Sequence, residues 1–75
     1  MESLDLHGTR HHLVDEMVRR FLNFAEVPCQ IITGQSAEMK SIVKKIVREY
    51  GWYSDEIDSY NVGTLIVTER DRKNS

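Results

Sequence analysis

The chain has 75 residues, enough for one domain with a small hydrophobic core. Hydrophobic residues make up 40% and charged residues 29%, a composition that excludes a disordered segment, and no apolar run is long enough to span a membrane. The net charge of −2 argues against nucleic-acid binding through bulk charge, and the single cysteine excludes an internal disulfide. Because Met1 is followed by an acidic residue rather than a basic, apolar signal region, we expect a cytoplasmic protein.

The first predicted element is a strand over residues 3–7, where polar and apolar side chains alternate. Leu4 and Leu6 are predicted to face the core, and Asp5 and His7 to project together from the opposite face.

Two amphipathic helices are predicted next, with a second strand between them. Apolar side chains recur at helical spacing over residues 11–25 and 37–50, and Ser36 and Gly51 are typical caps of the second helix. The β-branched run at residues 29–33 indicates the strand. The apolar stripes comprise Val14, Met17, Val18, Phe21, Leu22 and Ala25 in the first helix and Met39, Ile42, Val43, Ile46, Val47 and Tyr50 in the second.

The C-terminal part of the chain is predicted to close the sheet. Residues 52–60 show only weak alternation, residues 61–63 form a turn signal, and residues 64–68 are apolar enough for a central strand. Residues 70–75 are a polar tail, so we place a single domain at residues 1–69. The order β-α-β-α-β-β predicts a two-layer α/β sandwich with a mixed sheet, and right-handed crossovers place both helices on one face of it.

Parallel pairing of the first two strands brings the loops after them to one edge of the sheet. Helix N-termini at such an edge favour an anion, which Gly8 and Gly34 would allow to approach the backbone closely. Asp5 beside His7 suits general acid–base chemistry on a phosphate ester, although an exposed strand face gives the same residues. Without further information, that simpler interpretation is favoured.

Basic residues gather on the second predicted helix. Residues 33–50 carry four basic and two acidic side chains, or +2, which leaves −4 for the rest of the chain. Lys40, Lys44 and Arg48 are spaced four apart and form a stripe along which a phosphate backbone could lie. A solvated helix face explains the same stripe.

Other reactive or aromatic side chains are interpreted as structural. His7 and His11 are four residues apart but span a strand-to-helix junction, so no metal site is predicted. Cys29 is expected in the core. The aromatic residues near the end of the second helix are expected mainly to pack against the core at the edge opposite the site, and they are Tyr50, Trp52, Tyr53 and Tyr60.

Three stretches resemble the small MutS-related (Smr) domain family over nearly the whole chain. Residues 4–8 read LDLHG, the family's N-terminal motif, and residues 33–36 read TGQS where the family carries a TGxG or HGxG loop. Residues 62–67 read VGTLIV and look like its closing strand. The chain departs from the family in the TGQS loop, where Ser36 replaces the second glycine.

The resemblance implies an α/β sandwich that nicks DNA or cleaves RNA. It implies a catalytic role for Asp5 and His7 and a substrate-binding role for the TGxG-type loop. We therefore predict an endonuclease whose nucleic-acid interface comprises Gly8, Arg10, Thr33, Gly34, Gln35, Ser36, Lys40 and Lys44. The backbone N–H groups of residues 34–36 are predicted to hold the phosphate, with Asp5 orienting the His7 imidazole.

Several alternatives stay open from the sequence. The same loop and stripe suit a nucleic-acid or ribonucleoprotein binding module that does not cleave, whereas a protein–protein adaptor finds no large exposed apolar patch in the pattern. The substrate is RNA or DNA, no cofactor is identified from the sequence, and assistance by a divalent cation is left open. We expect a monomer with no membrane partner.

Overall fold

The computed structural model describes residues 1–56 and 63–70. It has the predicted element order, and the bounds are β1 (Ser3–Asp5), α1 (His11–Phe24), β2 (Cys29–Ile32), α2 (Ala37–Glu49), β3 (Tyr53–Glu56) and β4 (Thr64–Thr68). The predicted residues 57–60 of the weak strand, with Tyr60, the turn residues Asn61 and Val62, and residues 71–75 of the tail lie outside the described residues.

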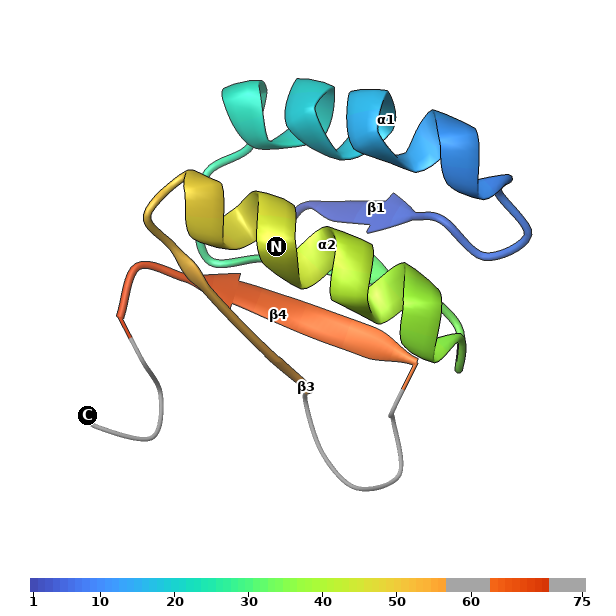
Figure 1. Ribbon diagram of the computed structural model, residues 1–75. Coiled ribbons are helices and arrows are strands. Elements are labelled where there is room, and N and C mark those ends of the chain that lie inside the picture. Colours follow the sequence, from blue (N-terminus) through green and yellow to red (C-terminus); the bar gives the residue numbers. More distant parts are fainter. Residues whose placement is uncertain (57–62, 71–75) are drawn as a thin grey trace.

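The four strands form one mixed sheet in the order β1-β2-β4-β3. Strand β1 pairs with β2 in parallel, and β4 pairs with both β2 and β3 in antiparallel fashion. Both helices lie on one side of this sheet (Figure 1). The predicted two-layer α/β sandwich is therefore confirmed, and the two strands that precede helices end at the same edge.

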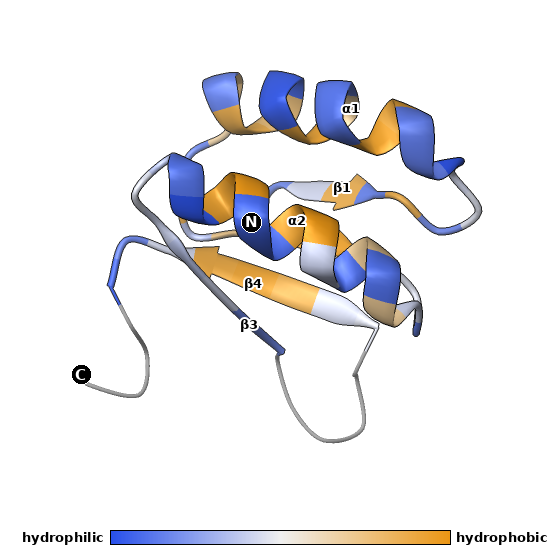
Figure 2. Cartoon of the chain, viewed as in Figure 1, coloured by the Kyte–Doolittle hydropathy of each residue, from blue (hydrophilic) through white to orange (hydrophobic). Residues whose placement is uncertain are grey.

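The core lies between the helices and the sheet. Each helix turns its apolar side toward the strands and its polar side away (Figure 2), as the helical spacing predicts. The buried apolar residues are Leu6, Val14, Val18, Leu22, Cys29, Ile31, Met39, Val43, Ile46, Val47, Leu65 and Val67. Burial, with a smaller contribution from the charge of Glu2, raises the pKa of the Cys29 thiol, which suits the core role predicted for it.

The aromatic residues next to α2 have different surroundings. Tyr50 and Trp52 pack partly buried against the core with their ring centroids 5.7 Å apart, while Tyr53 is 43% exposed. The chain reverses after α2 at Gly51, whose φ of +79° is the left-handed value expected of the predicted C-cap. No helix in the described part of the chain has the length and apolar character to cross a membrane.

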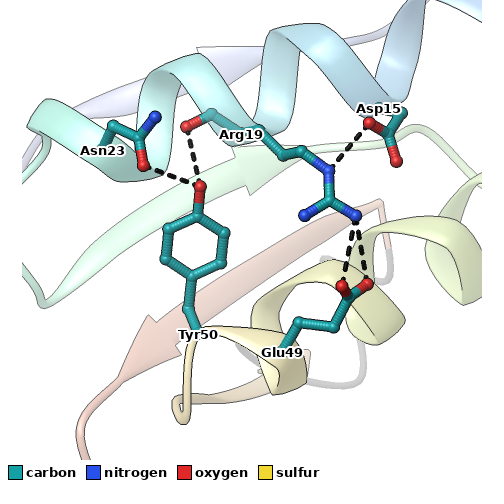
Figure 3. Close-up of polar contacts among 5 residues, drawn as sticks. All are labelled: Asp15, Arg19, Asn23, Glu49 and Tyr50. Atoms are coloured by element: carbon teal, nitrogen blue, oxygen red, sulfur yellow. Dashed lines mark hydrogen bonds and ion pairs between the residues drawn. The ribbon is translucent and has the colours of Figure 1, made fainter.

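Polar contacts fasten α1 to α2 along the helix flanks that face each other (Figure 3). The Arg19 guanidinium donates to Asp15 at 2.8 Å and to Glu49 at 3.1 Å, and these hydrogen bonds, first that with Asp15, raise the pKa of Arg19 above its ordinary value. One helical turn further on, the Tyr50 hydroxyl donates to Oδ1 of Asn23 at 2.7 Å and lies 3.2 Å from the Arg19 carbonyl.

Replacement of Tyr50 by phenylalanine is expected to lower the free energy of unfolding by about 0.5–1.5 kcal/mol. The substitution removes the hydroxyl that joins the two helices and keeps the ring against Trp52. Urea unfolding followed by circular dichroism measures the change. Tyr53→Phe is the matched control, because the exposed Tyr53 hydroxyl has no partner in residues 1–56 and 63–70, and an equal loss in both variants would contradict the assignment.

Candidate nucleic-acid interface

The LDLHG and TGQS segments meet at one edge of the sheet, as predicted. Strands β1 and β2 run parallel, so the loops that lead into α1 and α2 leave the sheet side by side. A Cβ on Gly34 would lie 3.3 Å from Cδ2 of the His7 ring. The exposed imidazole therefore lies directly against the backbone of the second loop, with both helix N-termini beside it.

The relation between Asp5 and His7 differs from the prediction. Strand β1 ends at Asp5, so His7 lies in the loop and does not share a strand face with it. Oδ1 of Asp5 instead accepts a hydrogen bond of 2.9 Å from the backbone N–H of His7. The carboxylate thus stabilises the turn that carries His7, because a short acidic side chain readily accepts from the N–H two residues on.

The second loop is closed by a residue from outside it. The carbonyl of Gly63 accepts from the backbone N–H groups of Thr33 and Gly34, at 2.8 and 3.0 Å. A Cβ on Gly63 would lie 3.3 Å from Cα of Gly34, so a larger residue would crowd the loop backbone and glycine eases this approach. The Gly34 N–H, which the sequence predicted to hold a phosphate, is therefore engaged within the fold.

Thr33 also has a supporting place rather than a ligand-facing one. Its side chain is buried, and its hydroxyl donates to the carbonyl of Gly34 at 2.8 Å and lies 3.2 Å from the carbonyl of Gly63. The Thr33 hydroxyl, which the sequence predicted to contact nucleic acid, is thus engaged within the fold. The sequence placed Gly63 in a turn and in the closing strand of the family resemblance, and neither prediction indicated its contact with Gly34.

The next residues leave backbone donors exposed at the start of α2. The N–H groups of Gln35, Ser36, Ala37 and Glu38 have no acceptor among the described residues, and all four residues are exposed. The positive end of the α2 dipole lies at the same place. The sequence predicted donors at residues 34–36, so the exposed set lies further toward the helix, with Ala37 and Glu38 added and Gly34 removed.

Ser36 forms the predicted N-cap of α2, and its hydroxyl accepts from the N–H of Met39 at 3.1 Å. Ser36→Ala is expected to lower the free energy of unfolding by about 1 kcal/mol, while Ser36→Gly lowers it by only a few tenths. Thermal or urea unfolding measures both variants, with Ser41→Ala on the exposed face of α2 as the control. Equal losses for Ser36→Ala and Ser41→Ala would contradict the capping role.

The cationic stripe on α2 is only partly open to a ligand. Nζ of Lys40 lies 3.0 Å from Oε1 of Glu56 on β3, and the Lys40 side chain is 15% exposed. Lys40, which the sequence predicted to contact nucleic acid, thus forms an ion pair with a residue that had no sequence signal. Lys44 and Arg48 are exposed and have no ion pair within the described residues. Gln35 and Lys44 border a shallow hollow with Lys40 and Glu56.

The start of α1 supplies the other side of the edge. Gly8 has a φ of +80°, which favours glycine, and Arg10 is exposed directly before the helix. Nδ1 of His11 lies 3.3 Å from Oε1 of Glu38, so an ion pair joins the N-terminal turns of the two helices when His11 is protonated. Within residues 1–56 and 63–70, no three side chains of histidine, cysteine, aspartate or glutamate gather as a metal site.

Comparison of the chain with protein-family models, curated proteins and solved structures gives no match. The functional interpretation consequently rests on this edge of the sheet and on its motifs. The structure brings together His7, Gly8, Arg10, Gly34, Gln35 and Ser36, places Lys44 along α2, and directs Thr33 and Lys40 to internal contacts.

Proposed function

We propose that this chain is a nucleic-acid-binding domain that cleaves phosphodiester bonds, with His7 as its general acid–base residue. The observation that carries the proposal is the His7 ring against Gly34, directly beside the exposed N–H groups that begin α2. A phosphate bound by these N–H groups lies within reach of an imidazole, the side chain best suited to proton transfer near neutral pH. The LDLHG and TGQS motifs, which resemble those of Smr domains, support the same assignment.

His7 acts on the attacking or the departing oxygen of the phosphodiester. As base, it takes the proton from a water molecule or an RNA 2′-hydroxyl while that oxygen forms a new bond to phosphorus. The leaving ester oxygen departs with the electrons of its broken bond and takes a proton from solvent. Asp5 is a positioning residue in this scheme, since its contact is with the His7 backbone. No group of three histidine, cysteine, aspartate or glutamate side chains gathers among the described residues, and no step is assigned to a metal ion.

A second candidate is a binding module that does not cleave. It is favoured by the engagement of the Gly34 N–H with Gly63 and of Lys40 with Glu56, which removes two of the predicted phosphate contacts. The Asp5 carboxylate also does not hold the imidazole, so the charged form of His7 gains no partner from it. Binding through Lys44, Arg48 and the start of α2 needs none of these groups.

Incubation of the purified protein with supercoiled plasmid and with a labelled structured RNA, with and without chelator, tests the proposal. Conversion of either substrate supports the nuclease assignment and names the substrate class. Cleavage that persists in the presence of chelator supports a reaction by His7 without a metal ion. Cleavage that chelator abolishes overturns it. A gel shift without cleavage supports the binding module, and the absence of both cleavage and binding would overturn the two candidates together.

Lys44→Ala is expected to weaken nucleic-acid binding and to lower the slope of log affinity against log salt by about one, the effect of losing one phosphate contact. Lys45→Ala is the matched control, because Lys45 is also exposed but points about 100° around the helix axis from Lys44. Fluorescence anisotropy titrations at several salt concentrations measure both slopes. A slope that falls equally in the two variants, or in neither, would contradict a specific path along Lys44.

A further inference from the structure

An apolar flank of α1 stays partly exposed on the side away from α2. Asp15 and Arg19 face α2, whereas Leu13, Met17 and Phe21 lie on the opposite flank of the same helix. The hollow on that flank is lined by Leu4, Leu13, Glu16, Met17, Arg20 and Phe21. Leu13 is 44% exposed although leucine favours burial, and no described residue covers it.

The same hollow borders the free edge of the sheet, because β1 is the outermost strand. The carbonyl of Glu2 accepts from Gln30 and the N–H of Leu6 donates to Ile32, so even-numbered residues direct their backbone groups toward β2. The backbone N–H and C=O groups of Ser3 and Asp5 therefore point outward. They have no hydrogen-bond partner within residues 1–56 and 63–70.

Acidic side chains lie beside β1. Glu2 and Asp5 are exposed beside β1, and Glu26 lies next to Glu2, to which its backbone N–H donates at 3.2 Å. The two charged residues of the hollow neutralise each other, since Arg20 and Glu16 form an ion pair of 3.0 Å. The edge consequently attracts a basic partner, and a second copy of this chain would bring like charges together.

We infer that β1 binds an extended basic peptide segment as an additional strand. A residue of the peptide opposite Leu4 points to the helix side, because paired residues share a face of the sheet, and its side chain enters the apolar hollow. Residues opposite Ser3 and Asp5 point to the other face, which carries the Asp5 carboxylate. The expected partner therefore has apolar and basic residues in alternation, and its binding surface is separate from the α2 donors of the proposed nuclease site.

A fluorescein-labelled peptide in which valine and lysine alternate is the probe, titrated into the full chain and followed by anisotropy. Two control peptides are used. One replaces every lysine by glutamate, and the other replaces two consecutive central residues by proline, so that an N–H needed for strand pairing is lost whichever way the peptide runs. The lysine peptide is expected to bind and both controls to bind at least tenfold more weakly. Equal binding of the proline peptide, or no binding of the lysine peptide, would overturn the inference.

Leu13→Asp is expected to weaken binding of the lysine–valine peptide about tenfold, since an apolar contact of the hollow is lost. Phe24→Asp is the matched variant on the same helix, 83% exposed and outside the hollow, and its affinity should equal that of the natural chain. A second readout needs no variant: amide hydrogen exchange of Ser3 and Asp5 slows when the peptide binds as a strand. Unchanged exchange at both amides, or equal loss of affinity in both variants, would refute strand addition.

Discussion

Replacement of His7 by alanine is expected to lower the rate of phosphodiester cleavage by about 10²–10⁴-fold, the range that a positioned general acid–base residue contributes. Nucleic-acid affinity is expected to stay within about twofold, because the donors at the start of α2 and the exposed Lys44 are unchanged. Single-turnover cleavage and anisotropy, measured on the same preparation, separate the two effects. The imidazole is exposed, so the substitution leaves the core intact.

His12→Ala is the matched control for His7→Ala, because His12 is an exposed histidine five positions along the chain. Its cleavage rate should equal that of the natural chain, and equal losses in both variants would point to a contaminating nuclease or a general charge effect. Asp5→Asn adds a test of the geometry. An asparagine Oδ1 still accepts from the His7 N–H, so this variant should lose much less activity than Asp5→Ala. Equal losses would mean that the carboxylate charge, rather than the turn, matters.

Leu6→Ala is expected to lower the free energy of unfolding by about 2–5 kcal/mol, the usual cost of truncating a fully buried leucine. A chain of this size has a total stability on the order of 4–11 kcal/mol, so the loss is a large share of it. Leu6 is 0% exposed, and it lies between Asp5 and His7 in the chain. The cavity left by its side chain therefore also loosens the loop that carries His7. Urea unfolding followed by circular dichroism measures the change.

Leu13→Ala makes the same chemical change on the exposed flank of α1 and is expected to cost about 0.5–1 kcal/mol. A cost for Leu6→Ala below that of Leu13→Ala would contradict the burial of Leu6. The cleavage assay links stability to the site, because the variant should recover activity when the temperature is lowered enough to keep it folded. A variant that is folded at low temperature and still inactive would show that Leu6 positions His7 directly.

Most of the fold was predictable because its signals are local. The helical spacing of Val14, Val18 and Leu22 requires a single buried stripe, and the β-branched run around Ile31 requires a strand. Ser36 at the start of α2 was predictable for the same reason, since a cap contacts a residue three positions away. The strand over residues 3–7 was predicted too long, because the turn held by Asp5 ends the pairing with β2 before His7.

The interior of the candidate site was less predictable. Glu56 had no signal in a stretch of weak alternation, and nothing local indicated that it would pair with Lys40, 16 residues away. Leu13 lies outside the apolar stripe of its helix, so the sequence assigned it no role. Its place beside β1, an edge strand, depends on the strand order. In both cases, a neighbour on another element decides the role of the residue.

By itself, the sequence of this protein determined the order of its elements, the buried face of each helix and the two loops that meet around His7. These follow from periodicity, caps and strand direction, which depend on residues close together in the chain. Only the tertiary structure decided which groups remain available to a ligand. The Gly63 carbonyl accepts a hydrogen bond from the Gly34 N–H, about 30 positions away, because β4 pairs antiparallel with β2. That pairing depends on strand order and register rather than on any local pattern.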